Sequence, residues 1–312
     1  MSRIGFVLLT HNNPSQLLRL VTRLNSMFGD PPIVCHHDFG KCPLPDGFLP
    51  SNVEFVRPYV NTKWGDFSLV EAMLRSLEQM YRRSDSPDWC VTLSGSCYPT
   101  KPAAQILANL EAGGYDAHFE VKDLGQDALS TDLHKQYYKR YCVKKLPFPS
   151  VNRRLRPVIR PLNIPHAIGH HLLPFSDTLR PYAGSQWFTV SRHAIATIFE
   201  FLKTPTAAAL TRHYRGLTYS DESYFQIIVC NSPSLKVHHD NLVYLDWSEK
   251  KEHPKLLTLV DLEAIKASHT HFARKFTLDA SADVLDALDR IIDSGSPCQT
   301  DPSTGTEAQA VT

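Results

Sequence analysis

Residues 4–38, IGFVLLTHNNPSQLLRLVTRLNSMFGDPPIVCHHD, decide the fold class of this 312-residue chain. The apolar run 4–9 predicts a buried strand, and the apolar residues of 17–24 recur at helical spacing. Asn13 stands before a proline and predicts the start of that helix, because an Asn side chain can accept a hydrogen bond from an unpaired backbone amide. Residues 32–35 predict a second short strand, so the stretch is a βαβ unit.

Strand and helix patterns continue to alternate, with strands predicted at 53–56, 89–93 and 117–121 and helices at 67–81 and 101–110. Alternation of this kind favours a mostly parallel sheet that is covered by helices on both faces. The rest of the chain predicts further elements, namely strands at 188–190 and 242–245, a helix capped by Ser191 and a last helix at 282–292. The sequence therefore predicts an α/β fold.

Composition excludes several classes of protein. Lys and Arg number 33 against 32 for Asp and Glu, so the formal net charge of +1 favours neither nucleic acid nor an anionic membrane. The seven cysteines are odd in number and contain no C-x-x-C pair, which favours reduced thiols. The first apolar run is far shorter than the roughly 18 residues that cross a bilayer. We expect a cytoplasmic protein with at most peripheral membrane contact and no nucleic-acid partner.

Polar residues follow the predicted strands, at the edge of a parallel sheet where ligands bind. They are Thr10 and His11 after the first strand, His36, His37 and Asp38 at the end of the second, and Thr62, Lys63, Trp64 and Gly65 after the third. The glycine-rich phosphate loops of dinucleotide dehydrogenases and P-loop enzymes are absent from the sequence. A ligand of another kind is therefore expected at this edge.

Three histidines and one aspartate of this set have the side chains that zinc or manganese prefers: His11, His36, His37 and Asp38. A metal-dependent hydrolase built on His11, His36 and Asp38 is thus an alternative. Adjacent residues of a strand point to opposite faces, however, so both neighbouring histidines cannot easily bind one ion. We favour one packed and one polar histidine, with Asp38 starting a loop or accepting a hydrogen bond from a ligand hydroxyl.

Segment 134–160 carries nine Lys and Arg residues, interleaved aromatic residues and no acid. Such a pattern is typical of a surface that binds a polyanion or an anionic glycan. The alternative is a solvated helix followed by a proline-rich loop.

The carboxyl-terminal third contains two candidate chemical groups. Asp221 and Glu222 stand where a helix is predicted to begin; we interpret Asp221 as a favourable charge at the helix N-terminus and Glu222 as a candidate general base. Arg274 and Lys275 lie between phenylalanines, which predicts two cations held near the core. Surface charges between two core aromatic residues are the alternative.

Eight segments, in this order, resemble those of the core-2/I-branching N-acetylglucosaminyltransferase and peptide O-xylosyltransferase family. They are LLTHNNPSQLLRL, CHHD, NTKWGDFSLVEAML, LSGSCYP, AGSQWFTVSR, SDESYFQIIVCNSP, DNLVYLDW and FARKF. The resemblance extends over residues 4–276 and implies a GT-A-like nucleotide-sugar fold. Its expected parts are a nucleotide-binding half, 1–122, an acceptor and catalytic half of the same domain, 123–293, which completes the site, and a disordered tail, 294–312.

The resemblance also implies an inverting, metal-independent glycosyltransferase that uses UDP-GlcNAc or UDP-xylose, a glycan or glycoprotein acceptor and no cofactor. Glu222 would be the general base, and Arg274 and Lys275 would hold the diphosphate. Donor contacts would come from Thr10, Asp38, Thr62, Lys63, Trp64 and His253, and the sugar and acceptor cleft from Gly184, Ser185, Gln186 and Trp187. Fixed cations suit this reaction physically, because a departing UDP gathers negative charge.

Two positions depart from the pattern of the family. Val243 stands where the family usually has an arginine that joins the lysine on the diphosphate, and Cys97 stands where an aspartate is common. Arg274, Lys63, Lys255 or His253 would have to compensate for Val243. An alternative without catalysis is a silent glycan- or polyanion-binding protein that uses segment 134–160.

Overall fold

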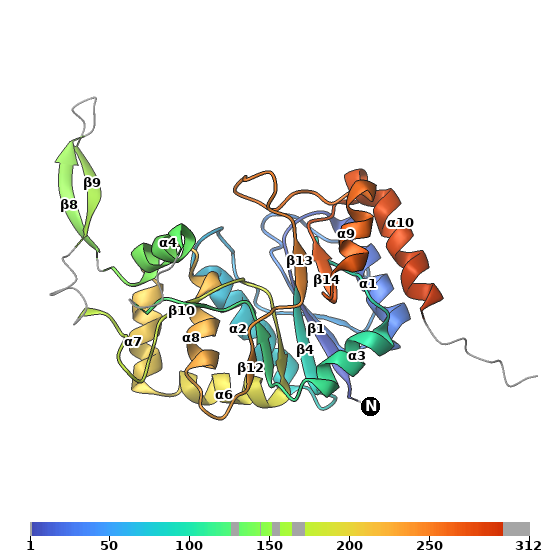
Figure 1. The fold of residues 1–312 in the computed structure, drawn as a ribbon, viewed down its shortest axis with the longest axis horizontal. Helices are drawn as coiled ribbons and strands as arrows, with labels where there is room; N and C mark the ends of the chain where they lie inside the picture. Colours follow the sequence, from blue (N-terminus) through green and yellow to red (C-terminus); the bar gives the residue numbers. More distant parts are fainter. Residues whose placement is uncertain (1, 126–130, 144, 152–156, 164–171, 296–312) are drawn as a thin grey trace, which may run out of the picture.

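The computed structural model describes residues 2–125, 131–143, 145–151, 157–163 and 172–295 (Figure 1). Its central layer is a seven-stranded sheet in the order β12-β6-β11-β4-β1-β2-β3. The strands are β1 (Ile4–Thr10), β2 (Ile33–His37), β3 (Val53–Phe55), β4 (Trp89–Ser94), β6 (Ala117–Phe119), β11 (Phe188–Ser191) and β12 (Val237–His238). Only β11 runs antiparallel to its neighbours within this sheet, so the predicted, mostly parallel α/β fold is confirmed.

Helices cover both faces of the sheet (Figure 1). On one side, α2 (Ser68–Arg82) packs on β1 and β2, together with α6 (Arg192–Leu202) and α8 (Tyr224–Cys230). On the other side lie α1 (Pro14–Phe28), α3 (Ala103–Ala112) and α10 (Leu278–Ser294). Arg19 of α1 forms ion pairs with Asp286 and Asp289 of α10, which ties the end of the described chain to its beginning.

Two predicted helix starts have different outcomes. Ser191 caps α6 as expected, since its hydroxyl accepts a hydrogen bond from the Ala194 amide. Asn13 does precede α1, but its side chain makes no capping bond. Asn13 has a left-handed backbone with φ of 50°, a conformation that Asn tolerates, and its carbonyl accepts from Leu17 N instead. The start of α1 was thus predicted correctly and the capping bond was not.

A smaller sheet is built almost wholly from late segments. It consists of β13 (Val243–Leu245), β14 (Phe272–Arg274) and β5 (Tyr98–Pro99), in that order. The short helices η4 (Leu259–Asp261) and α9 (Leu262–Ala267) connect β13 to β14. This sheet fixes the end of β14, where the predicted cation pair is located.

The remaining elements surround the carboxyl half of the sheet. β7 (Lys122–Asp123) pairs with β10 (Tyr182–Ala183), while α4 (Asp132–Tyr141) and α7 (Pro205–Tyr214) lie nearby (Figure 1). β8 (Lys145–Val151) and β9 (Pro157–Asn163) form a hairpin that projects from the body. The predicted proline-rich loop was therefore wrong for these residues. Each strand of a two-stranded ribbon keeps one free edge, where proline removes no ladder hydrogen bond.

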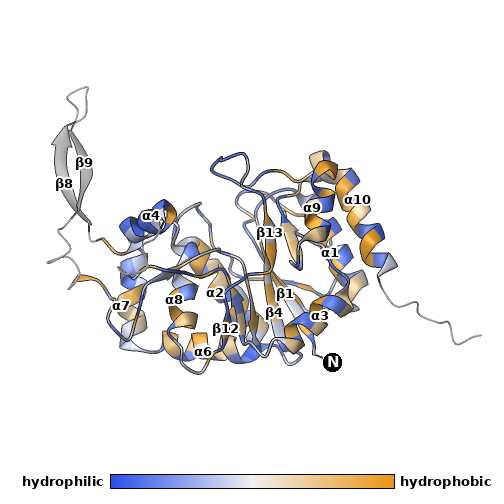
Figure 2. Cartoon of the chain, in the orientation of Figure 1, coloured by the Kyte–Doolittle hydropathy of each residue, from blue (hydrophilic) through white to orange (hydrophobic). Residues whose placement is uncertain are grey.

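The core follows the central strands. Phe6, Val7 and Leu8 of β1 are fully buried, as expected for a strand covered on both faces. Figure 2 shows hydrophobic residues along the central strands and alternating hydrophobic and hydrophilic residues on the outer helices. No helix in the described ranges has the length and apolarity needed to cross a bilayer. The predicted tail lies outside the described residues beyond Gly295.

Candidate active site

Glu222 lies at the end of a short 3-10 helix, η3 (Ser220–Glu222), immediately before α8. Hydrogen bonds fix its backbone on both sides. The Glu222 carbonyl accepts from Gly184 N at 2.7 Å, and the Glu222 amide donates to Tyr219 O at 3.1 Å. Tyr219 itself has a left-handed backbone, which turns the chain into η3. The structure therefore joins the predicted base to the predicted segment Gly184–Trp187.

Gly184 has a steric role in this joint. A Cβ atom at Gly184 would lie 1.8 Å from the carbonyl oxygen of Glu120, which no side chain tolerates. The next residues are held as well, because Ser185 O accepts from Gln226 Nε2 at 2.6 Å and Ser185 Oγ accepts from Trp187 N at 3.2 Å. The segment is thus a fixed wall beside Glu222.

Charged groups surround the Glu222 carboxyl. Burial and the charge of Asp221 raise the pKa of Glu222 to about 7, although the Arg140 guanidinium acts in the opposite direction. Arg140 Nη1 donates to Glu222 Oε2 at 3.0 Å. A carboxyl that titrates near neutral pH is well matched to general base catalysis at that pH.

Asp221 differs from the predicted favourable charge at a helix N-terminus, because its carboxyl is buried. It is 7% exposed, and its Oδ1 atom has no hydrogen-bond partner. Burial raises the pKa of Asp221 to about 6. The sequence placed Asp221 correctly at the start of a helix but gave no sign of this burial.

Arg140 was not predicted as a site residue. It was counted in the basic segment 134–160, but the structure turns it from α4 towards Glu222. Its guanidinium also lies 4.4 Å from the centre of the Tyr219 ring. A usable signal was present, because Tyr137, Arg140 and Tyr141 share one face of a helix at spacings of three and four. The side chains of residues 144–171 lie outside the described part of the chain.

Asp38 and Thr62 are brought together as predicted. The Asp38 Oδ2 atom accepts from the Thr62 amide at 2.8 Å and from the Thr62 hydroxyl at 2.7 Å. Burial alone would raise the pKa of Asp38, but these hydrogen bonds and Lys41 lower it below its usual value. Asp38 Oδ1 is buried without a partner. The acceptor capacity of this oxygen is thus unused among the described residues.

The histidines of β2 differ from expectation. His36 and His37 are both buried, at 1% and 0% exposed, so the prediction of one packed and one polar ring was wrong. Both faces of this parallel sheet are covered, and each ring therefore finds an internal hydrogen bond. His36 Nε2 accepts from Val60 N, while His37 bonds the Thr10 hydroxyl at 2.8 Å and Cys42 O. Within the described ranges, His, Cys, Asp and Glu form no group of three that could hold a metal ion.

The loop that carries Trp64 packs against the loop that precedes Glu222. Gly65 O accepts from Tyr219 N at 2.8 Å, and the Trp64 ring meets the Tyr219 ring edge-on at 4.8 Å. Trp64 is 59% exposed and also contacts the ring of His253 at 5.9 Å. Trp64 and His253 thus line one rim of the site, whereas Lys63 is exposed beside Asp66.

Arg274 and Lys275 follow one another at the end of β14. The Arg274 guanidinium lies 5.1 Å from the ring centre of Trp187, a 4% exposed residue, and its Nε atom is buried without a hydrogen bond. Burial lowers the pKa of Arg274, and burial and the charge of Arg274 lower the pKa of Lys275. Neither cation has an ion pair with a described carboxylate. Two adjacent, partly buried cations without a described ion-pair partner are suited to binding an anion.

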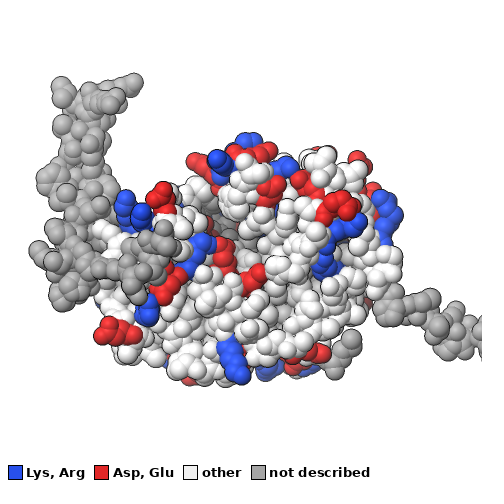
Figure 3. All heavy atoms as spheres, in the orientation of Figure 1, with Lys and Arg blue, Asp and Glu red and all other residues white. Residues whose placement is uncertain are grey.

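Each member of the cation pair lies near a different set of predicted residues: Lys275 near His11 and Arg274 near Trp187. Burial lowers the pKa of His11, and the charges of Lys41 and Lys275 lower it further while Asp38 opposes them. Lys275 therefore lies on the side of the strand ends of β1 and β2, and Arg274 lies on the side of Trp187. Figure 3 shows a hollow on this face between α4 and the segment after β13, with acidic and basic side chains around it.

Val243 does not place a polar group in this site. It is 8% exposed in β13 and pairs with Phe272 of β14. Lys255, one candidate for compensation, is held by Asp261 at 2.6 Å. Cys97 is buried, and its Sγ atom accepts a hydrogen bond from the Ser94 amide. Burial lowers the pKa of Arg274, and the nearby Cys97 acts in the opposite direction.

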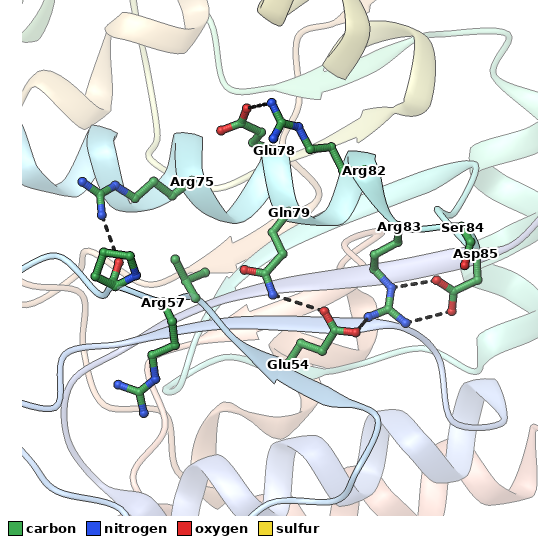
Figure 4. A pocket seen from close by; sticks show the side chains of 11 residues that line it. Glu54, Arg57, Arg75, Glu78, Gln79, Arg82, Arg83, Ser84 and Asp85 are labelled. Atoms are coloured by element: carbon green, nitrogen blue, oxygen red, sulfur yellow. Dashed lines mark hydrogen bonds and ion pairs between the residues drawn. The ribbon is translucent and has the colours of Figure 1, made fainter.

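A pocket of about 540 Å³ lies elsewhere, between β3 and α2 (Figure 4). Most of its charges pair with one another: Arg83 with Glu54 and Asp85, and Arg82 with Glu78. None of the predicted site residues lines it. This pocket is therefore distinct from the candidate site at Glu222 and the cation pair.

Comparison with known proteins identifies the family. The mixed α/β fold with a mostly parallel central sheet matches the fold class expected from the sequence. The model of the Core-2/I-branching enzyme family matches residues 49–269, and the chain belongs to this family.

Individual relatives agree with the family match. Xylosyltransferase 2 of Rattus norvegicus is 24% identical over 250 residues, which cover 73% of this chain and 26% of that protein. Beta-glucuronosyltransferase GlcAT14A of Arabidopsis thaliana is 30% identical over 112 residues, which cover 35% of this chain and 24% of that protein. The chain spans about a quarter of the length of these curated relatives. Among solved structures, galactosyltransferase LgtC with donor and acceptor sugar analogs gives a TM-score of 0.39 at 9% identity, covering 96% of this chain and 98% of LgtC.

Proposed function

We propose that the chain is an inverting glycosyltransferase that moves GlcNAc or xylose from a UDP-sugar to a hydroxyl of a glycan or protein. The observation that carries the proposal is the combination of a partly buried Glu222 carboxyl with a near-neutral pKa and the unpaired cations Arg274 and Lys275. Membership of the Core-2/I-branching enzyme family supports it.

In the proposed reaction the acceptor oxygen attacks C1 of the donor sugar. A bond forms between that oxygen and C1, the bond from C1 to the phosphate oxygen breaks, and UDP leaves with the electron pair. Glu222 takes the proton of the acceptor hydroxyl. Attack on the face opposite to the leaving group inverts the configuration at C1.

Arg274 and Lys275 would stabilise the departing diphosphate. A fixed cation in a partly buried site interacts with a developing negative charge far more strongly than it would in water. This pair would act in place of a divalent metal ion.

The other predicted residues would hold the substrates. Asp38 Oδ1, which is buried and unpartnered, would accept a hydrogen bond from the donor nucleotide, with Thr10 and Thr62 around it. Lys63, Trp64 and His253 would complete the donor rim. The wall formed by Gly184, Ser185, Gln186 and Trp187 would line the sugar and acceptor cleft.

Donor turnover tests the proposal directly. The purified protein is incubated with UDP-GlcNAc, UDP-xylose and UDP-glucuronic acid, with and without oligosaccharide acceptors, and released UDP is measured. The same donors are screened by thermal shift, since a ligand at 100 times its Kd adds about 2.7 kcal/mol to the stability of the fold. UDP release from GlcNAc or xylose donors supports the proposal. A flat thermal-shift panel without UDP release overturns it, and binding of polyanions alone would then favour the silent binding protein.

A further inference from the structure

We propose that Arg140 is a positioning residue that orients the Glu222 carboxyl, and that the buried Asp221 carboxylate opposes its electrostatic effect. The inference rests on the proposed role of Glu222 as the base.

The backbone contacts of Glu222 do not fix the direction of its carboxyl group, so a side-chain partner is required. The Glu222 backbone is fixed by Gly184 and Tyr219, but among the described residues only Arg140 forms a hydrogen bond with its carboxyl. That bond engages Oε2, whereas Oε1 has no described partner and the side chain is 32% exposed. Oε1 is thus the oxygen left to receive the proton of an acceptor hydroxyl.

Arg140 is itself held in a defined place. Its guanidinium lies 4.4 Å from the ring centre of Tyr219, 5.5 Å from that of Tyr137 and 5.7 Å from that of Tyr141. Tyr141 OH also donates to Tyr219 O at 2.6 Å, which ties the end of α4 to the loop of the base. Three aromatic rings and a planar guanidinium fix the direction of the Arg140 hydrogen bond.

The charged or titratable groups that act on Glu222 among the described residues can each be assigned to an element. Arg140, Tyr137 and Tyr141 come from α4, Asp221 from η3, and Lys122 from β7, where it pairs with Glu120. Arg140 and Lys122 favour the charged form of Glu222, while Asp221 favours its neutral form. Arg140 and Asp221 should therefore shift the titration of the base in opposite directions.

The test compares variants that remove each effect. Arg140→Met removes the hydrogen bond and the charge, Arg140→Lys keeps the charge, and Asp221→Asn removes the opposing charge. Lys139→Met is the matched control, because Lys139 is the exposed neighbour of Arg140 on α4. The pH dependence of kcat/KM is measured for each variant. The Glu222 carboxyl is also titrated by carbon-13 NMR, with its signal assigned by its loss in Glu222→Gln.

We expect Arg140→Met to raise the apparent pKa of Glu222 by about one unit or more and Asp221→Asn to lower it by a similar amount, as neighbouring charges do. Arg140→Met should lower kcat at least about tenfold with little change in donor KM, because a misdirected base loses proton transfer rather than binding. Arg140→Lys should recover the position of the pH profile, and Lys139→Met should match the wild type.

Two results overturn the inference. In the first, folded Arg140→Met loses activity without any shift of the Glu222 titration; in the second, Arg140 and Asp221 variants shift it in the same direction. The proposed function fails separately, when the NMR titrations shift as expected but no UDP-sugar is turned over by the wild-type protein.

Discussion

At the residue scale, Glu222 combines an anchored backbone with a carboxyl whose charge is balanced by its neighbours. Burial and Asp221 favour the protonated form, and Arg140 favours the carboxylate. A buried acid without that arginine would remain protonated at neutral pH, and an exposed acid without burial would be a weaker base. The pKa of Glu222 is therefore set by contacts with other elements and not by the motif around Glu222 alone.

Glu222→Gln should reduce glycosyl transfer roughly 100-fold or more and leave UDP binding nearly unchanged, because the amide cannot accept the proton of the acceptor. Steady-state transfer and calorimetric UDP binding measure the two effects. The matched control is Glu200→Gln on the exposed part of α6. Full activity in Glu222→Gln would remove Glu222 from the mechanism.

Asp221→Asn should make the fold more stable at pH 8 and leave it unchanged near pH 3. The pKa of Asp221 is raised from 3.8 to about 6 in the folded state, so the folded protein binds this proton more tightly than the unfolded chain. The stability that this proton contributes is therefore lost as pH rises from about 4 to 6, by on the order of 3 kcal/mol. Chemical denaturation from pH 3 to 8 measures the free energy of unfolding of the wild type and of Asp221→Asn. Equal denaturation curves for these two proteins at pH 8 would contradict the expectation.

Individual residues also show what a sequence can and cannot reveal. The motif around Glu222 predicted the helix start at which this residue lies, because that signal is local; its role as the base stays a prediction. Arg140 was missed, because its partner is 82 positions away and only the packing of α4 joins them. The burial of Asp221 and of both histidines in β2 likewise depends on distant segments.

At the scale of elements, the meeting of two loops builds the site. The β10–β11 connection supplies Gly184, whose amide holds the Glu222 carbonyl, and the loop before α2 supplies Gly65, whose carbonyl holds Tyr219. Periodicity predicted the strands and helices on either side well. The prediction failed for 145–151 and 157–163, where the number of prolines suggested a loop and the two segments pair as antiparallel strands instead.

Gly184→Ala should destabilise the fold and slow transfer together. Its Cβ would meet the Glu120 carbonyl, and overpacking of this kind costs about 1–3 kcal/mol or more. Relief of the clash must move the amide that holds Glu222 O. Thermal melting and kcat report both effects, with Gly216→Ala as control because a Cβ there meets its nearest atom at 3.6 Å. Wild-type melting in Gly184→Ala would show that the wall is not rigid.

Val243→Arg tests the departure from the family pattern on β13. The sequence suggested that an arginine there would restore a cation beside the diphosphate and tighten UDP binding. Val243 is buried against β14, however, so we expect a loss of several kcal/mol of stability and no gain in UDP affinity. Melting temperature and UDP affinity are measured together, with Val243→Met as the uncharged control. Tighter UDP binding in a stable variant would show that the arginine reaches the site.

At the scale of the whole molecule, the site depends on segments from both ends of the chain. Asp38 and Thr62 come from the first half, Glu222 and the cation pair from the second, and β11 and β12 of the second half complete the central sheet. The order of βαβ patterns predicted this sheet, because parallel strands and the helices between them produce different periodic patterns of apolar residues in the sequence. The placement of the cation pair at the end of β14 was not visible without the resemblance, because it depends on the small sheet of β5, β13 and β14.

Removal of metal ions tests whether protein side chains alone stabilise the departing diphosphate. If Arg274 and Lys275 stabilise the departing diphosphate, saturating EDTA should leave the transfer rate essentially unchanged. Lys275→Ala should then slow transfer at least about 100-fold, which corresponds to the roughly 2.7–4 kcal/mol lost with one fixed donor at an oxyanion site. Lys266→Ala, an exposed lysine paired with Glu263, is the matched control. A complete block by EDTA that manganese reverses would contradict the metal-independent mechanism, because a divalent ion, held by Asp38 or a neighbouring group, would then carry the charge assigned to the cation pair.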